Sequence, residues 1–236
     1  WRVFDYAERF QTMVFGFNDL DLGMNRWKTS GFTYPDSPMD RGKVVRSQEE
    51  MDSIPEYGRY RDVDGDGIAY RTLPGSGLDP ILYRGTGHDE DGGYSEDPQV
   101  YHDAMARLKR KIDGAREHLP APVIREEEKK DLGVIFYGSM ENTIVEIDDM
   151  LEESGLSVST CRVRALPLHS GVEDFVRRHD RTIVLEINRD GQLFGIIRKE
   201  FPAELIPKIH SVSYSDGMPP RARVYSDMIL KVLEGS

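Results

Sequence analysis

The feature that most constrains this fold is a regular alternation of short apolar stretches and amphipathic stretches from Leu132 onward. The apolar stretches are rich in β-branched residues and predict strands, whereas the stretches between them have helical periodicity. We expect strands at 133–137, 158–165, 182–187 and 209–213, and helices at 142–153, from Ser170 onward, at 191–200 and at 219–233. This alternation predicts an α/β fold with a doubly wound parallel sheet that helices cover on both faces.

The N-terminal stretch predicts the end of a second α/β unit. Its apolar residues have helical spacing up to Phe10, Met13 to Phe17 predict a short buried strand, and Asn18 to Asp21 predict the loop after that strand. Residue 1 is Trp, and no capping residue precedes the first helix. We therefore expect that the natural N-terminus lies upstream.

The middle of the chain predicts a long irregular connection. The stretch from Gly23 to Asp97 is dense in Gly, Pro, Asp and Tyr, and its one convincing helical start is a capping box at Ser47. Pro98 after Asp97 predicts the start of the longest helix, which should end near His118. The proline-containing, Glu-rich residues 119–130 predict a linker.

The charge balance argues against nucleic acid and membrane partners. The chain has 42 acidic and 31 basic residues and a net charge of -11, which repels phosphate backbones and anionic lipid surfaces. The densest basic stretch, from Arg107 to Lys111, is interpreted as one solvated helix face. No apolar stretch approaches the ~20 residues that span a bilayer, so we expect a cytoplasmic protein.

The single cysteine, Cys161, limits the chemistry that this chain can hold by itself. One cysteine forms no internal disulfide, and an iron–sulfur cluster typically takes four thiolates. Cys161 lies in an apolar run, which predicts a buried and inert thiol. Because the histidines are scattered without metal-ligand spacing, we expect no metal site in this chain.

Two partial motifs overlap between Asp62 and Gly67. The alternating aspartates match the first half of a calcium loop, but its twelfth position is Leu73 instead of Glu, which favours a tight acidic turn. The triplet Gly65-Asp66-Gly67 is similar to the start of the thiamine-diphosphate motif. That motif also needs an Asn shortly afterwards, and none occurs between Asn25 and Asn142. We therefore assign neither motif.

The stretch from Arg84 to Glu90 carries the most reactive set of side chains. Glycines on both sides of Thr86 allow close approach of the backbone, Arg84 can bind a carboxylate with its fork, and His88 can carry a proton. The alternative interpretation is an exposed polar loop. In the predicted sheet, ligands or partners usually meet the carboxyl ends of the strands. These ends are Gly138–Ser139, which is interpreted as a helix cap, Leu166–Pro167 and Asn188–Gly191.

Five segments together resemble one enzyme family, the alpha subunits of 2-oxoacid:ferredoxin oxidoreductases, particularly the 2-oxoglutarate type. They are DLDLGMN at 19–25, RYRDVDGDGIAYRTL at 59–73, RGTGHDE at 84–90, RVRALP at 162–167 and NRDGQL at 188–193. The resemblance implies coenzyme A-dependent oxidative decarboxylation of a 2-oxoacid to an acyl-CoA and carbon dioxide. It also implies that two electrons pass to ferredoxin.

The resemblance implies a division of labour between subunits. Residues 1–25 would end a thiamine-pyrimidine-binding domain, residues 26–130 would form an irregular connection with one long helix, and residues 131–236 would form a transketolase-C-terminal-like domain. Thiamine diphosphate, Mg²⁺ and a [4Fe–4S] cluster would be held mainly by the beta subunit. The family's Tyr-Pro-Ile-Thr-Pro motif and the stretch that grips the 2-oxoacid are absent, so we assign no catalytic residue and expect this chain alone to be inactive.

The resemblance and the polar loop together give one set of candidate residues for the active-site rim or the partner interface. They are Asp19, Asp21, Asn25, Arg84, Thr86, His88 and Glu90. Two other functions stay open. The chain could be a non-catalytic assembly module whose acidic surface docks the beta subunit, or part of a lipoamide-linked 2-oxoacid dehydrogenase E1 component.

Overall fold

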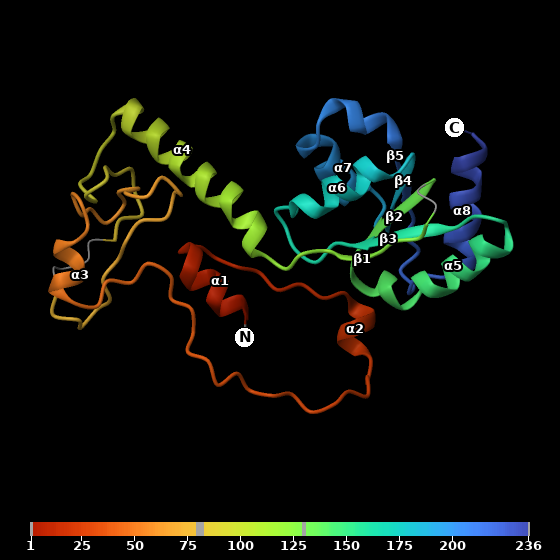
Figure 1. Ribbon diagram of the computed structural model, residues 1–236, viewed down its shortest axis with the longest axis horizontal. Helices are drawn as coiled ribbons and strands as arrows, with labels where there is room; N and C mark the ends of the chain where they lie inside the picture. The colour runs from red at the N-terminus through yellow and green to blue at the C-terminus, as the bar shows by residue number, and fades with distance from the viewer. Residues whose placement is uncertain (1, 79–82, 129–130, 236) are drawn as a thin grey trace. The chain divides into compact units, whose positions relative to one another are not determined.

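The computed structural model describes residues 2–78, 83–128 and 131–235 and divides into two compact units. Unit 1 consists of Trp1–Gly16 and Thr29–His118, and unit 2 consists of Phe17–Lys28 and Leu119–Ser236. In Figure 1, where the colour follows the residue number, both units can be traced by their helix and strand labels. Trp1 and the Lys129–Lys130 end of the expected linker lie outside the described residues.

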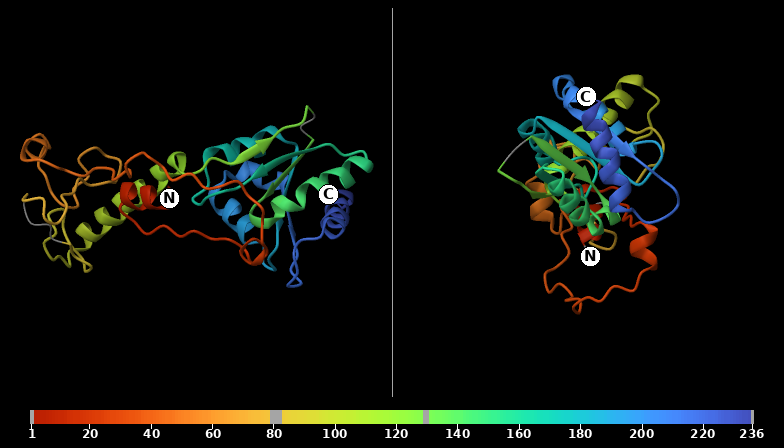
Figure 2. Two further views of the ribbon diagram at one scale, coloured as in Figure 1. Left: turned by 90° about the horizontal axis from the view of Figure 1, so that it is seen from below. Right: turned by 90° about the vertical axis from the view of Figure 1, so that its right-hand side faces the viewer.

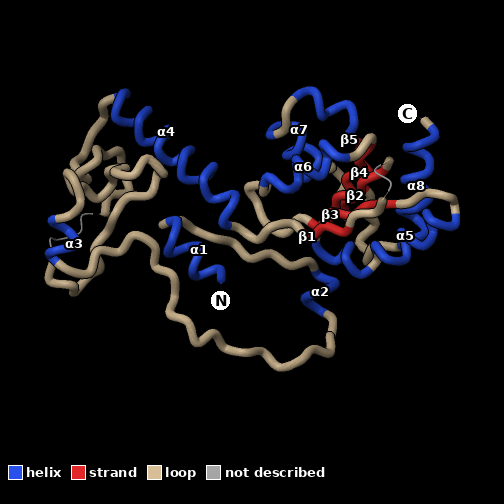
Figure 3. The backbone as a smooth tube through the Cα atoms, viewed as in Figure 1, coloured by secondary structure: helices blue, strands red, loops and turns tan. Residues whose placement is uncertain are grey.

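Unit 2 contains one five-stranded sheet in the order β1-β3-β2-β4-β5, drawn in red in Figure 3. The strands are β1 (Val123–Arg125), β2 (Leu132–Phe136), β3 (Val158–Arg162), β4 (Arg181–Glu186) and β5 (Ile209–Ser213). Strands β3, β2, β4 and β5 pair in parallel, and β1 pairs antiparallel with β3 at the sheet edge. The predicted α/β class with a parallel sheet is confirmed.

Helices cover both faces of this sheet, as the predicted alternation of strands and helices requires. The helices are α5 (Ile144–Glu153), α6 (Ser170–Arg178), α7 (Gln192–Glu200) and α8 (Ala222–Glu234), with 3₁₀ turns at η2 (Gly138–Asn142) and η3 (Ala203–Lys208). Val134 and Phe136 of β2 pack with α5 and α8, whereas Ile135 packs with α6 and α7. Figure 1 and Figure 2 show the two helix pairs on opposite sides of the sheet.

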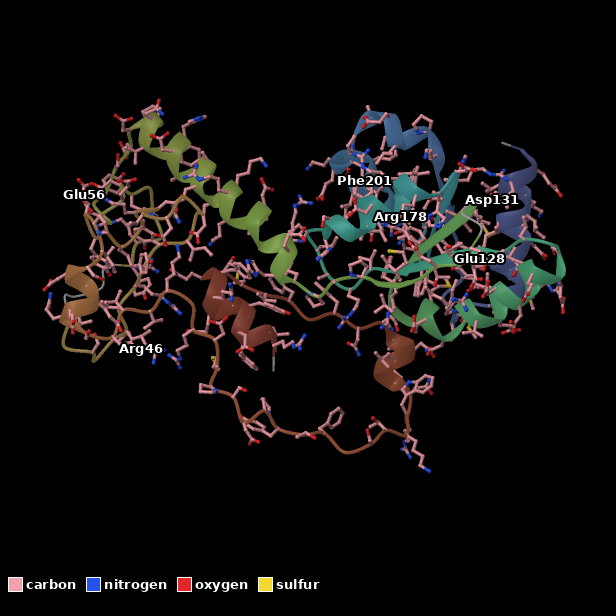
Figure 4. All side chains as sticks on the ribbon, in the orientation of Figure 1. Arg46, Glu56, Glu128, Asp131, Arg178 and Phe201 are labelled. Atoms are coloured by element: carbon pink, nitrogen blue, oxygen red, sulfur yellow. The ribbon has the colours of Figure 1, made fainter. Side chains whose placement is uncertain are left out.

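The expected linker contains the edge strand β1, so that part of the prediction is wrong. Val123 and Ile124 pair with Arg162 and Cys161 of β3 and cover an edge that would otherwise expose its backbone groups. Strand β1 has only three residues, one of them the charged Arg125, and such a short pattern cannot be distinguished from a linker. Arg178, labelled in Figure 4, donates from Nε to Glu126 at 2.9 Å and ties the segment after β1 to α6.

The predicted strand from Met13 to Phe17 is also wrong, because no strand forms there. Met13 is 80% exposed, Phe15 69% and Phe17 91%. A strand needs a partner strand, and the described residues of unit 1 contain only the isolated bridges Val44–Arg71 and His88–Tyr94. The expected loop after it instead leads into the short helix α2 (Leu20–Met24).

Unit 1 is built on helices and turns. Its elements are α1 (Arg2–Phe10), α3 (Gln48–Asp52), α4 (Pro98–Ala115) and η1 (Arg116–His118). The predicted start of α4 is confirmed, because Asp97 accepts from the amides of Gln99 at 2.7 Å and Val100 at 3.4 Å. No helix within the described ranges is long and apolar enough to cross a membrane.

Helix α4 does not present a uniformly solvated basic face, which corrects the interpretation of Arg107 to Lys111. Lys109 is 76% exposed at its side chain, but Lys111 is only 7% exposed. The loop at Gly67 causes this difference. Gly67 has a φ of +82°, and a Cβ there would lie 2.5 Å from the carbonyl oxygen of Arg107 and the amide nitrogen of Lys111. The loop therefore packs directly on the helix backbone.

The boundaries of the two units differ from the expected divisions at residues 25 and 130. The stretch Phe17–Lys28, which contains α2, belongs to unit 2 with the sheet. The assignment of residues 1–25 and 26–130 to the end of a pyrimidine-binding domain and its connection, and of residues 131–236 to a transketolase-C-terminal-like domain, stays a prediction.

Replacing Gly133 should test how tightly β2 packs on α6. A Cβ at Gly133 would lie 2.6 Å from the buried ring of Phe175, which itself stacks on His179 at 4.2 Å. We expect Gly133→Ala to lower the free energy of unfolding by about 1–3 kcal/mol through overpacking. Urea unfolding followed by circular dichroism measures this change.

Gly195→Ala is the matched control, because Gly195 lies in α7 of the same unit and a Cβ there meets nothing within 4 Å. We expect this variant to gain up to about 1 kcal/mol, since alanine favours a helix interior. Equal stability of the two variants would contradict the packing argument.

Candidate functional site

The candidate site is a groove of about 410 Å³ in unit 2, at the edge where the parallel strands end. Ligands of open α/β sheets bind at this edge. The lining residues come from α2 and its flanks, from the segments after β2 and β4, and from the segment after β5 that leads into α8. They are Asp19, Leu20, Asp21, Met24, Asn25, Ser139, Ile187, 214–221 and Tyr225.

Asp19 attaches α2 to the segment after β2. Its Oδ2 accepts from the amide of Ser139 at 2.6 Å, and its Oδ1 accepts from the amide of Leu22 at 3.2 Å as the N-cap of α2. Gly138 has a φ of +62°, and a Cβ there would lie 2.6 Å from Asp19 Oδ2. The amide at the turn Gly138–Ser139 therefore binds the carboxylate of Asp19.

Asp21 and Asn25 line the same groove, Asp21 from within α2 and Asn25 from directly after it. Asn25 donates from Nδ2 to Asp21 Oδ1 at 3.1 Å, one helical turn away. The structure thus brings together the three candidate residues that precede residue 26, and it places them beside the strand ends of unit 2. Their carboxylates favour a hydrogen-bond donor or a cation as the facing group.

A buried carboxylate organises the floor below the groove. Glu186, at the end of β4, is 1% exposed and accepts from the amides of Leu193 at 2.6 Å and Phe194 at 3.1 Å. These amides belong to the first turn of α7, where a negative charge is favourable. Asn188 donates from Nδ2 to Glu186 and to the hydroxyl of Tyr137, each at 3.0 Å.

The two tyrosines of this floor stay protonated near neutral pH. Burial raises the pKa of Tyr137, and the charge of Glu186 raises it further. Burial raises the pKa of Tyr225 to about 12, and its hydroxyl donates to the carbonyl oxygen of Glu186 at 3.1 Å. Both hydroxyls therefore act as hydrogen-bond donors and not as general bases.

Asp216 and Arg221 close the rim of the groove on the side of β5. Asp216 accepts from Arg221 at 2.5 Å, from the hydroxyl of Tyr214 at 3.1 Å and from the amide of Met218 at 3.0 Å. The Met218 amide, followed by Tyr214 and Arg221, lowers the pKa of Asp216. The rim therefore carries an ion pair on this side, and the carboxylates of Asp19 and Asp21 lie on the α2 side.

The other candidate residues lie in unit 1, where they build an ordered turn. Arg84 donates from Nε to the carbonyl oxygen of Gly92 at 2.9 Å, so its fork is partly occupied. The Nδ1 atom of His88 lies 2.8 Å from the carbonyl oxygen of Thr86, and the His88 ring lies 4.0 Å from the ring of Tyr60. Thr86 itself is exposed.

Glu90 takes part in a charged contact of the same turn. Its carboxylate lies 3.3 Å from Arg61 Nε, and its carbonyl oxygen accepts from the amide of Tyr60 at 2.8 Å. The seven candidate residues are thus divided between the units, with Asp19, Asp21 and Asn25 in unit 2 and Arg84, Thr86, His88 and Glu90 in unit 1. Their common role at an active-site rim or partner interface stays a prediction.

The described residues do not fit the cofactors that the resemblance implies. Cys161 is fully buried, and burial raises its pKa to about 12, which disfavours the thiolate that binds iron. Asp64 and Asp66 pair with Lys43 at 2.6 and 2.8 Å, and Asp62 pairs with Arg110 at 2.8 Å. Within the described ranges, no group of three or more His, Cys, Asp or Glu side chains could hold a metal ion.

Sequence reasoning missed Glu186, Tyr137, Tyr225, Asp216 and Arg221. The signal that could have found Glu186 is its place inside the β-branched run of β4, where a buried acidic residue requires donors. The donors are the amides at the start of α7, which the NRDGQL segment supplies. The other four residues carry no local pattern that marks them.

Asp19→Ala should release α2 from the strand ends. The substitution removes the acceptor of the Ser139 and Leu22 amides, and a buried amide without a partner costs about 1–3 kcal/mol. We expect hydrogen exchange at the Ser139 amide to accelerate at least ~10-fold. Asp21→Ala is the control, because the Asp21 carboxylate accepts from the side chain of Asn25, whereas the Ser139 amide donates to Asp19. Unchanged Ser139 protection in Asp19→Ala would refute the attachment.

Comparison with known proteins identifies a protein of similar sequence. No protein-family model matches the chain. The chain is 29% identical over 205 residues to the subunit alpha of 2-oxoacid:ferredoxin oxidoreductase 2 from Aeropyrum pernix, which covers 84% of this chain and 30% of that protein.

One solved structure matches the fold of most of this chain. The 2-oxoglutarate:ferredoxin oxidoreductase from Magnetococcus marinus, with 2-oxoglutarate, coenzyme A and succinyl-CoA bound, matches 83% of this chain and 33% of its own with a TM-score of 0.69 and 21% identity. A split gene transketolase matches 48% of the chain and 41% of its own at 18% identity, with a TM-score of 0.38. The chain spans about a third of the length of the two oxidoreductases. The chain is therefore similar in sequence to an alpha subunit of a 2-oxoacid:ferredoxin oxidoreductase, the family that its five sequence segments resemble.

Proposed function

We propose that this chain is part of a 2-oxoacid:ferredoxin oxidoreductase that converts a 2-oxoacid and coenzyme A to an acyl-CoA and carbon dioxide. The observation that carries the proposal is its similarity, over 84% of its length, to a subunit alpha with this activity in its name. We propose 2-oxoglutarate as the 2-oxoacid. The Magnetococcus marinus enzyme of the same fold, which holds 2-oxoglutarate and succinyl-CoA, supports this choice.

The chain would act with a beta subunit and pass electrons to ferredoxin in the cytoplasm. Thiamine diphosphate would supply the ylid and the electron sink of the reaction. Thiamine diphosphate, Mg²⁺ and a [4Fe–4S] cluster would be held mainly outside this chain. The buried Cys161 and the ion-paired aspartates of residues 62–66 support this division, because these side chains are already committed to structural contacts.

A second candidate function, a non-catalytic assembly module, has an observation of its own. Ten large apolar side chains between Met13 and Met39 are exposed, among them Phe17 at 91% and Phe32 at 95%. Exposed apolar side chains in such density are typical of surfaces that contact another protein. An assembly role and a role in the oxidoreductase are compatible, since a subunit can dock its partner and complete the active site.

Reconstitution of the complex tests the proposed activity. The complete alpha polypeptide, which contains this chain, is co-expressed with the beta subunit, and ferredoxin reduction is measured with coenzyme A and either 2-oxoglutarate or pyruvate. We expect reduction that requires coenzyme A, with kcat/KM at least ~10-fold higher for 2-oxoglutarate. Acyl transfer to lipoamide without ferredoxin reduction would instead show an E1 component, and a complex without either activity would leave only the assembly role.

Substitution of Arg84 and His88 tests their proposed place at the rim or interface. In the reconstituted complex, we expect Arg84→Gln or His88→Ala to lower turnover or beta-subunit affinity at least ~10-fold. Arg46→Gln is the control, because it removes one positive charge from an exposed position of the same unit. Thermal melts establish that the variants fold. Turnover and affinity equal to those of the control would contradict the proposal.

A further inference from the structure

The contact between α4 and the loop at Gly67 concentrates positive charge in an otherwise acidic chain. Asp62 is the carboxylate that this contact uses, and both of its oxygens are occupied. Its Oδ1 accepts from the amide of Gly67 at 2.9 Å, and its Oδ2 accepts from Arg110 at 2.8 and 3.2 Å. Its side chain is only 7% exposed. Asp62 therefore pairs directly with Arg110, and both of its oxygens already accept hydrogen bonds.

Three other cations near this contact make hydrogen bonds or ring contacts with uncharged groups of the described residues. Arg107 donates from Nη1 to the carbonyl oxygen of Gly67 at 3.0 Å, and Lys111 donates to the carbonyl oxygen of Gln11 at 3.2 Å. The guanidinium of Arg59 lies 4.9 Å from the ring centroid of Tyr60 and 4.7 Å from that of Tyr83. Its Nε is buried without a hydrogen-bond partner among the described residues.

These three cations share one electrostatic environment. Burial lowers the pKa of Lys111 to about 8, and the charges of Arg107 and Arg59 lower it further. Burial also lowers the pKa of Arg107; Asp62 partly offsets this effect, and Arg59 opposes the charge again. The three side chains therefore repel one another in a partly desolvated place. Such an arrangement is unfavourable until a negative charge compensates it.

The neighbouring cations show that this pattern is not general in unit 1. Arg61 contacts Glu56 at 2.6 Å, Arg71 contacts Glu8 at 2.6 Å, and Lys43 contacts Asp64 at 2.6 Å. Carboxylates are abundant in a chain with a net charge of -11, so pairing partners were available. Among the described residues, the hydrogen-bond and ring partners of Arg59, Arg107 and Lys111 are neutral, and an anion from outside the chain would compensate these three cations.

We propose that Arg59, Arg107 and Lys111 form a binding site for an oxyanion, the phosphate or carboxylate group of a small-molecule ligand. The two guanidinium groups suit this ligand, because their planar forks match phosphate and carboxylate oxygens. Arg59 and Arg107 are half-buried, so solvent reaches them, whereas Lys111 is only 7% exposed. The rings of Tyr60 and Tyr83 hold the Arg59 guanidinium in place.

Titration calorimetry with the 236-residue chain tests the site without reference to enzymatic activity. Inorganic phosphate and succinate are the probes, at constant ionic strength set with chloride. We expect binding with a Kd of roughly 1 mM or lower. Binding of phosphate alone would indicate a phosphate-bearing ligand, and binding of succinate alone would indicate a carboxylate. Absence of binding by both probes would overturn the proposal.

Variants then assign the binding to these residues. We expect Arg59→Gln and Arg107→Gln to raise the Kd at least ~10-fold, because each removes one charged fork. Lys109→Gln is the matched control, since it removes one charge from the same helix at an exposed residue that pairs with Asp113. Its Kd should stay within about 2-fold of the unsubstituted chain. An equal Kd for all three variants would overturn the assignment.

A titration of Lys111 in the unsubstituted chain keeps the test independent of variant folding. The Cε resonance of Lys111, observed by NMR with labelled lysine, should report a pKa of about 8 in chloride. A bound oxyanion stabilises the charged ammonium, so its pKa should rise at saturating phosphate or succinate. A Lys111 pKa that the anion leaves unchanged would show that the anion binds elsewhere.

Discussion

The buried carboxylate of Glu186 is the interaction on which the carboxyl edge of unit 2 depends. A buried charge is costly unless hydrogen bonds compensate it, and Glu186 receives bonds from the Leu193 and Phe194 amides and from Asn188. These bonds fix where α7 begins relative to β4. The carbonyl oxygen of Glu186 accepts from the Tyr225 hydroxyl and the Tyr214 amide, so α8 and the segment after β5 are fixed at the same point.

The same carboxylate constrains the turn between β4 and α7. Gly191 has a φ of +62°, and a Cβ there would lie 3.0 Å from Ser211 Oγ and 3.1 Å from Ser213 Oγ. A side chain at this position would therefore push β5 away or move the first amides of α7 from Glu186. The groove inherits its geometry from this turn, because Ile187 and Tyr214, which line it, follow β4 and β5 directly.

The sequence predicts the sheet of unit 2 well because its parallel strands are buried on both faces. Continuous apolar runs mark β2 and β4, and the expected β5 at 209–213 agrees with the structure in both bounds. The prediction fails where a strand depends on distant partners. Met13 to Phe17 have strand-like residues but no sheet to join, and β1 is too short for a periodic signal. In the groove, the family resemblance predicted Asp19 as a candidate residue. Glu186 was not predicted, because the apolar pattern of β4 identifies a strand without indicating a role for its one carboxylate.

Helix α4 shows why a local charge pattern does not predict the environment of each charge. Arg107 and Lys111 are four residues apart and share one helix face, whereas Lys109 points away from that face. The interpretation as solvated surface therefore fits Lys109, with its side chain 76% exposed, but not Lys111, which is 7% exposed. What separates them is Gly67, whose backbone contacts the helix from 40 residues earlier in the chain. Arg59 adds its charge from the same distant stretch of the chain. A local sequence pattern therefore cannot bring Arg59 together with Arg107 and Lys111.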